Sequence, residues 1–266
     1  MIARWWRRRR EARTLRTRAV PSALWQLTLQ RYPFLAALDD AGRERLQALV
    51  SLFLADKEFT AVGGLELSDE IAVSIAAQAC LPVLELELGL AAYDGFVGIV
   101  VHPDEVVAQR EHVDEHGILH RYEEVLTGEA MEGGPVMLSW HDVAEAGVTA
   151  ERGYNVVIHE FVHVLDMADG LAADGVPVLP GRAARVHWLQ VLESAYQRLC
   201  RELDAGREPF LDPYGAEAIE EFFPVAAEAF FVAPHALRDE QPALYELFRD
   251  YFRQDPAARL APQPGA

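Results

Sequence analysis

The feature that most constrains this chain is an apolar segment with two histidines one helical turn apart. The segment Val156–Asp166 reads VVIHEFVHVLD, a His-Glu-x-x-His pattern among β-branched and aromatic residues. Positions i and i+4 of an α-helix share a face, so His159 and His163 can reach one metal ion, with Glu160 beside them. Burying these groups without partners costs several kcal/mol. We therefore expect a buried helix that binds zinc, the alternative being a histidine pair that matches the pattern by chance.

A catalytic zinc site needs a third protein ligand. Asp169 lies six residues after the second histidine, a spacing that some zinc peptidases use. Those peptidases have a glycine where this chain has Asp166, and without that turn Asp169 does not come back to the metal. Better candidates lie downstream in a phenylalanine-rich helix, where Glu221 and Glu228, seven residues apart, share a face. Glu228 is also a candidate for a buried acid that supports the ligands, while we expect Glu220 to face solvent.

Asp166 itself lies in the last turn of the expected metal-binding helix, where the helix macrodipole disfavours negative charge. Two partners for it follow from the sequence. One is the free ring N–H of a ligand histidine, as in many metal sites. The other is an ion pair with an arginine such as Arg182.

Composition narrows the classes of function. The 266 residues are 51% hydrophobic and 25% charged, which is ordinary for a globular protein. A net charge of −18 argues against a main surface that binds nucleic acid. Two cysteines, Cys80 and Cys200, exclude a four-cysteine zinc site. The sequence contains no stretch of about 18 uninterrupted apolar residues of the kind that spans a membrane. We expect a cytoplasmic protein.

Charge is spread unevenly along the chain. Residues 1–18 contain eight arginines and one acid, with Trp5 and Trp6 among them. We expect residues 1–20 to form a basic, poorly ordered tail, the alternative being a segment that contacts anionic lipid or nucleic acid. Residues 21–266 are expected to form a single domain, helical over 21–95 and catalytic over 96–266.

Periodicity and turn signals predict an α+β domain with a helical N-terminal layer, because strands come first and helices follow. A proline at position 33 separates two helices within 21–54, and Ser68 suits the cap of another. The expected strands are 58–62, 96–101, 122–126 and 135–140. The expected later helices are 155–169, 183–205, 217–232 and 241–254.

Stretches beyond the metal motif resemble the Mlc titration factor A metallopeptidases, whose catalytic helix pattern is similar to that of the anthrax lethal factor protease. They cover roughly residues 21–258 in order and leave the arginine tail outside. The stretches are Gly64–Leu67, Cys80–Leu86, Tyr93–Phe96, Gly134–Trp140, Gly153–Met167, Asp212–Tyr214, Glu221–Phe231 and Phe248–Pro256.

The resemblance implies a zincin-like fold, in which a small mixed or antiparallel sheet packs on the helix that carries the motif. It implies one zinc ion bound by His159, His163 and Glu221. It also implies that Glu160 is the catalytic acid and base and that Tyr214 is the active-site tyrosine.

Pro224 departs from the family pattern, which has a helix-compatible residue at this place. Proline clashes with the carbonyl four residues before it, here that of Glu220. The helix therefore begins close to Pro224 or is kinked there. The third ligand is Glu221 by resemblance, with the neighbouring register at Glu220 as the alternative.

The resemblance further implies an aminopeptidase-like zinc peptidase, a monomer that acts on peptide substrates. It links the chain to the glucose phosphotransferase system through the transcriptional repressor Mlc. We expect the strand Val136–Trp140 to hold the substrate in extended form. The competing hypothesis is a non-catalytic protein that sequesters a transcriptional repressor.

Overall fold

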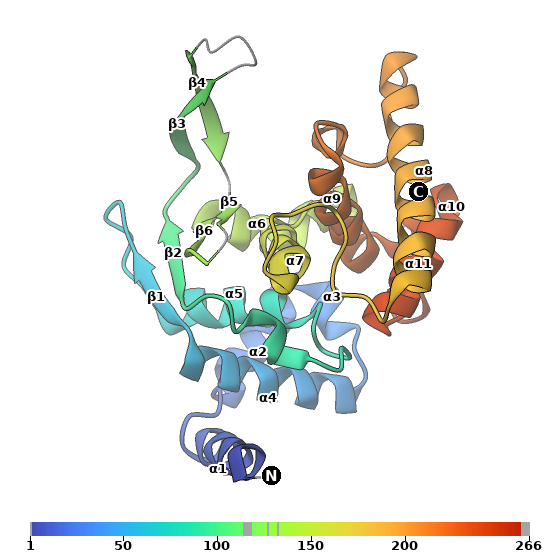
Figure 1. The fold of residues 1–266 in the computed structure, drawn as a ribbon. Helices are drawn as coiled ribbons and strands as arrows, with labels where there is room; N and C mark the ends of the chain where they lie inside the picture. Colours follow the sequence, from blue (N-terminus) through green and yellow to red (C-terminus); the bar gives the residue numbers. More distant parts are fainter. Residues whose placement is uncertain (1, 114–118, 127, 132, 262–266) are drawn as a thin grey trace.

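The structure, a computed structural model, describes residues 2–113, 119–126, 128–131 and 133–261 (Figure 1). A small sheet lies on one side of the central helix α7, helices α2, α4 and α5 lie beneath both, and helices α8 to α11 form the other side. The α-helices are α1 (Ile2–Thr17), α2 (Ser22–Arg31), α3 (Pro33–Ala36), α4 (Asp40–Asp56), α5 (Asp69–Cys80), α6 (Trp140–Thr149), α7 (Val156–Asp166), α8 (Arg182–Asp204), α9 (Ile219–Val232), α10 (Pro234–Glu240) and α11 (Pro242–Phe252).

Six strands belong to two sheets among the described residues. They are β1 (Glu58–Ala61), β2 (Gly98–His102), β3 (Val106–Val113), β4 (Leu119–Leu126), β5 (Gly128–Ala130) and β6 (Val136–Ser139). The four-stranded sheet has the order β1-β2-β6-β5, in which β1, β2 and β6 are parallel and β5 is antiparallel to β6. β3 and β4 pair as an antiparallel hairpin. The sheet is therefore small and mixed, and α7 packs against β5 and β6.

The N-terminal layer follows the expected signals. α2 ends at Arg31 and α3 begins at Pro33, because proline fits the first position of a helix but not its interior. The Ser68 hydroxyl accepts a hydrogen bond from the N–H of Ile71 at 3.3 Å and so caps α5. β1, within the part expected to be helical, pairs with β2 on the other side of residue 95. The two parts thus share one sheet.

The basic N-terminus differs from the expectation of a poorly ordered tail. Residues 2–17 form the helix α1, which packs against α4, with Arg10 lying 4.0 Å from Asp56. Arginine has a high helix propensity, which favours a helix in this arginine-rich segment. No helix in the described ranges combines the length and the apolar character that crossing a bilayer requires.

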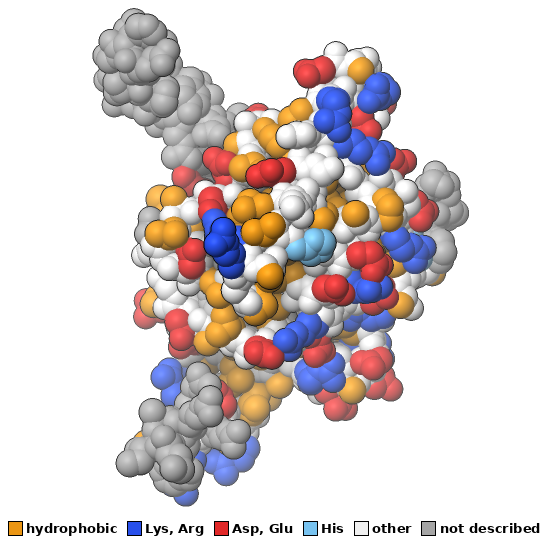
Figure 2. Space-filling view, turned by 45° about the vertical axis from the view of Figure 1, so that its right-hand side comes forward, with side chains coloured by type: hydrophobic (Ala, Val, Ile, Leu, Met, Phe, Trp, Pro, Cys, Tyr) orange, Lys and Arg blue, Asp and Glu red, His pale blue; other side chains and the backbone are white. Residues whose placement is uncertain are grey.

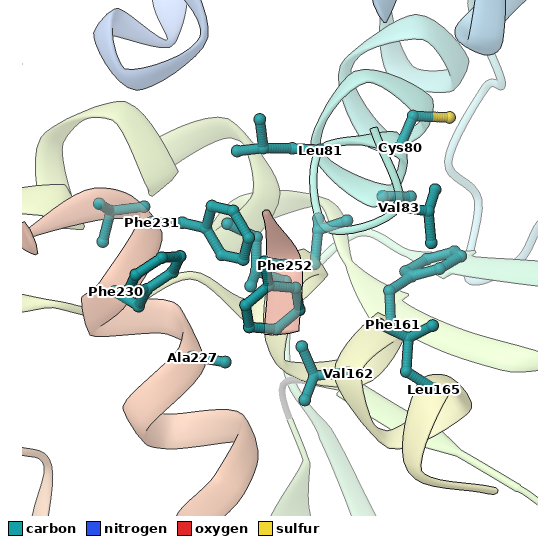
Figure 3. Packing of buried hydrophobic residues seen from close by; sticks show 14 of the residues in the cluster. Cys80, Leu81, Val83, Phe161, Val162, Leu165, Ala227, Phe230, Phe231 and Phe252 are labelled. Atoms are coloured by element: carbon teal, nitrogen blue, oxygen red, sulfur yellow. The ribbon is translucent and has the colours of Figure 1, made fainter. Parts of the chain in front are cut away.

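The core lies where α7, α9 and the end of α5 meet. Figure 3 shows Val162 of α7 on the side of Phe252, whose ring packs on Phe230 and Phe231 of α9. Phe161 lies on the other side of α7, near Val83, and its ring packs on Phe53 and Tyr93. These side chains are 0–2% exposed. This packing fixes α7 against α9, and these are the two helices that carry the candidate ligands.

Besides α1 and the four-residue α3, the sequence did not lead us to expect β3, β5, α6 or the seven-residue α10. α10 lies between Pro234 and Pro242, each of which begins a helix, and Pro242 keeps Gln241 out of helical conformation. β5 has only three residues, too few for a periodic pattern.

The surface carries both signs of charge, and it is hollowed by an apolar pocket. On the face in Figure 2, acidic and basic side chains are interspersed around hydrophobic ones. A pocket of about 660 Å³ opens at the C-terminal end of α7 and is lined by residues that include Leu165, Trp188 and Tyr251. His159, His163 and the downstream glutamates do not line it.

Candidate metal centre

α7 carries the two histidines on an almost fully buried helix. Asn155 caps its first turn, because its side-chain oxygen accepts a hydrogen bond from the N–H of Ile158 at 2.9 Å. The rings of His159 and His163 have centroids 4.9 Å apart, and His159 is only 8% exposed. The expected helix therefore forms, and it brings the two imidazoles together.

Glu221 reaches both imidazoles from α9. Its Oε2 lies 3.2 Å from Nε2 of His159 and 3.1 Å from Nε2 of His163. α9 begins at Ile219, so Pro224 falls in its second turn and the register places Glu221 at the histidines. The helix thus contains the proline instead of beginning at it.

Three ligand atoms converge within the described residues. One atom each from His159, His163 and Glu221 lies within 4.8 Å of the other two, a set of two imidazoles and one carboxylate that suits zinc. Asp169, the weaker candidate from the sequence, lies in a 3₁₀ turn (Met167–Asp169) and accepts a hydrogen bond from the N–H of Leu171 at 2.9 Å. It does not join the group.

The electrostatics of the group favour a cation between its members. Burial alone would raise the pKa of Glu221, but hydrogen bonds from His159 and His163 hold it well below its usual range. Burial alone would lower the pKa of His159, but the charge of Glu228 and the hydrogen bonds that His159 donates to Glu221 and Glu228 raise it well above its usual value. Positive charge is therefore stabilised at this point.

Glu160 is the buried acid beside the ligands. It is 5% exposed, and its Oε2 makes no hydrogen bond to any residue that the structure describes. Burial is the main cause that raises its pKa to about 8, and the neighbouring glutamates add to the effect. A buried polar oxygen without a partner calls for an explanation, and a water on a metal held by the neighbouring histidines supplies one. The residues present thus fit a metal.

Glu228 contacts the far side of the first imidazole. Its Oε1 lies 2.7 Å from Nδ1 of His159, and its Oε2 accepts a hydrogen bond from the N–H of Asn155. Burial raises the pKa of Glu228, while these two neighbours act in the opposite direction. Of the two sequence interpretations of Glu228, the contact with a candidate ligand is the one that the geometry favours.

Tyr214 lies next to the same imidazole. It belongs to a 3₁₀ turn (Pro213–Ala216) that Asp212 caps by accepting a hydrogen bond from the N–H of Tyr214 at 2.9 Å. The Tyr214 ring centroid is 6.0 Å from that of His159, and the side chain is 39% exposed. A substrate at the histidines can therefore reach this ring.

Asp166 has a different partner from the two that the sequence suggested. Its carboxylate accepts hydrogen bonds from the backbone N–H groups of Gly175 and Val176, both at 2.8 Å, instead of pairing with a ligand histidine or with Arg182. Gly175 in turn packs on the first residue of α9, since an added Cβ would lie 3.0 Å from the Ile219 carbonyl oxygen. Asp166 therefore fastens the end of α7 to the loop that supports the start of α9.

Sequence reasoning did not single out Asn155 or Gly128 as part of the site. Asn155 precedes the apolar run as a helix-capping residue does, so its capping role could have been predicted from the sequence. Its contact with Glu228 could not, because the two residues are 73 positions apart. Gly128 lies on β5 against Glu160, where an added Cβ would be 2.5 Å from Oε1 of the glutamate. No local sequence pattern predicts that Gly128 and Glu160 lie so close together.

This chain is similar to known proteins over nearly its whole length. The chain is 37% identical to the Mlc titration factor A of Pectobacterium atrosepticum over 238 residues, which is 89% of this chain and 88% of the relative. It is 36% identical to the Mlc titration factor A of Serratia proteamaculans over 250 residues, 93% of each chain. An uncharacterized protein of Synechocystis is 36% identical over 234 residues, 87% of this chain and 84% of the relative.

The family match begins earlier in the chain than the resemblance noted in the sequence, which covered roughly residues 21–258. Residues 3–253 match the family described as glucose-regulated metallo-peptidase M90, so the match includes most of the basic N-terminal helix. With a His-His-Glu group at its centre and relatives that align over most of its length, the chain belongs to the M90 family of glucose-regulated metallo-peptidases and is related to the Mlc titration factor A proteins.

Proposed function

We propose that this protein is a zinc-dependent, aminopeptidase-like peptidase whose metal is bound by His159, His163 and Glu221. The observation that carries the proposal is the convergence of these three side chains from two helices beside the buried Glu160. A zinc ion there would supply Lewis acidity toward a scissile carbonyl and toward a water molecule.

Glu160 acts as the general base and then as the general acid. It takes a proton from the attacking water and delivers it to the leaving amine. Glu160 is buried directly beside the candidate ligands, and its Oε2 makes no hydrogen bond to a described residue. Both properties suit a group that accepts and returns a proton.

Tyr214 stabilises the developing oxyanion. Its ring lies beside His159, and its partial exposure leaves it accessible to a substrate. A hydrogen bond from its hydroxyl to the oxyanion would resemble the single-donor contributions measured in other hydrolases, about 3–4 kcal/mol.

The substrate binds in extended form along β5. We expected the strand at Val136–Trp140 to offer its edge, but β6 (Val136–Ser139) is paired on both sides, with β2 and with β5. The outer strand of the sheet on this side is β5, which packs on α7. An added peptide strand would therefore pair with β5 next to Glu160.

The relatives' name suggests a partner. Two relatives are called Mlc titration factor A, and we propose that this chain also contacts an Mlc-like repressor in the cytoplasm and so affects the glucose phosphotransferase system. We propose a monomer that binds no nucleic acid directly. The competing function is binding of the repressor without catalysis.

One experiment separates the two functions. Bound metal and cleavage of amino-acid p-nitroanilides are measured for the wild type and for Glu160→Gln. A peptidase should contain zinc and lose turnover in Glu160→Gln while keeping its metal. Unchanged turnover in that variant would refute the mechanism. A binding-only protein would lack turnover in both forms and would bind the repressor equally well after zinc is stripped.

A further inference from the structure

Buried hydrogen bonds connect α5, through the start of α7, to the first histidine. Gln78 on α5 accepts a hydrogen bond from Nδ2 of Asn155 at 2.7 Å. The backbone N–H of Asn155 donates to Oε2 of Glu228, and Oε1 of Glu228 lies 2.7 Å from Nδ1 of His159. All four side chains are between 0% and 8% exposed. Three helices therefore act together on one imidazole.

The chemistry of each group fixes the direction of these hydrogen bonds. A backbone N–H can only donate, so Oε2 of Glu228 accepts from Asn155. The side-chain oxygen of Asn155 is occupied by the N–H of Ile158, which leaves its amide hydrogens for Gln78. When Nε2 of His159 binds a metal, Nδ1 carries the proton, and Oε1 of Glu228 is the acceptor. This position needs two accepting oxygens, which a carboxylate provides.

We propose that Glu228 is a positioning residue for the metal centre, which fixes the tautomer and ring orientation of His159 and is itself held by Asn155. The proposal rests on the proposed function, because it assumes that His159 is a metal ligand. Glu228 is not a ligand in this arrangement. It approaches Nδ1, whereas Nε2 of both histidines faces Glu221.

A purely structural role for Glu228 makes a different prediction, and the chain offers a matched control. Asp166 is a second buried carboxylate on the same pair of helices, and it accepts hydrogen bonds from two backbone N–H groups, those of Gly175 and Val176. Replacing either acid by its amide removes one acceptor and the negative charge. Only the replacement of Glu228 changes the partner of His159.

The test measures zinc dissociation constants by competition with a chelator, together with unfolding midpoints, for the wild type, Glu228→Gln, Glu228→Asp and Asp166→Asn. A glutamine whose oxygen serves Asn155 turns its NH₂ toward Nδ1 and favours the wrong tautomer of His159. We expect Glu228→Gln to weaken zinc binding about 10–100-fold. Asp166→Asn should lower the unfolding midpoint and weaken zinc binding much less than Glu228→Gln does, because neither of the hydrogen bonds that Asp166 accepts comes from a candidate ligand. Glu228→Asp keeps the negative charge, but its shorter side chain no longer reaches Nδ1 of His159. This variant serves for the zinc measurement if Glu228→Gln does not fold.

A second measurement reports on the imidazole directly. In the zinc-loaded wild type, the Nδ1–H proton of His159 should give a slowly exchanging signal in the proton NMR spectrum, and the signal should be lost in Glu228→Gln. If both Glu228 variants bound zinc as tightly as the wild type, the role proposed for Glu228 would be wrong and the proposed function would stand. A loss of zinc affinity in Asp166→Asn equal to that in Glu228→Gln would have the same meaning. A wild type that binds no zinc would overturn the proposed function, and the inference with it.

Discussion

Gly128 on β5 lies against Glu160 on α7 so closely that a Cβ added to the glycine would fall 2.5 Å from Oε1 of the glutamate and 2.7 Å from its Cγ. Glycine at this place lets the outer strand of the sheet approach the helix. We propose that β5 binds the substrate and that Glu160 transfers the proton. β5 therefore also sets the position of the Glu160 carboxylate.

Gly128→Ala should lower kcat/KM about 100-fold, because displacing a catalytic group by about 1 Å has an effect of that size. Zinc affinity should be unchanged, since the clash involves Glu160 and not the ligands. Peptidase kinetics and a zinc titration check both results. Gly95→Ala is the matched control, because an added Cβ there meets nothing within 4 Å. Full activity in Gly128→Ala would show that Glu160 does not act from this position.

Glu221→Gln should reduce zinc affinity by more than the factor of about 10–100 that is typical of residues outside the ligand set. Glu220→Gln should bind zinc as the wild type does, because the structure brings Glu221 and not its neighbour to the histidines. Metal content per chain after dialysis distinguishes the two. Normal zinc content in Glu221→Gln with a loss in Glu220→Gln would mean that the helix register is shifted by one residue.

Much of this site could be predicted from the sequence because its parts are local. The spacing of His159 and His163 is a property of one helix turn, and the apolar run around them indicates burial. Glu221 lies 58 residues from His163, and no helical periodicity spans that distance. Resemblance to a family selected it. The partner of Asp166 could not be predicted, because the N–H groups that it binds belong to an irregular loop.

The fold was predictable to a similar degree and for similar reasons. Caps and prolines marked α5 and the break between α2 and α3, because both act on neighbouring residues. The order of the strands in the sheet could not be predicted from the sequence. β5 is adjacent in space to β6 through an antiparallel pairing of three residues, and this made our choice of β6 as the exposed edge wrong.

Removal of zinc should lower the melting temperature by about 5–10 °C relative to protein with zinc at about 100 times its dissociation constant. The physical reason is that zinc binds the folded chain, where His159, His163 and Glu221 converge, and not the unfolded one. Calorimetry with and without a chelator measures the shift. Glu221→Gln is the control and should show almost no shift. A wild-type melting temperature that does not respond to zinc would contradict the metal site.

Asp166→Asn should remove a pH dependence of stability in the acidic range. Burial raises the pKa of Asp166 to about 6 from an ordinary value of 3.8, although hydrogen bonds from Gly175 and Val176 oppose the rise. A carboxyl group whose pKa is higher in the folded state binds more protons there. Its contribution to the free energy of unfolding therefore falls as the pH rises from about 4 to about 6, and is constant above. Urea unfolding across this range should show the advantage of the wild type over Asp166→Asn shrinking with pH. An advantage that stays constant would mean that Asp166 is ionised throughout.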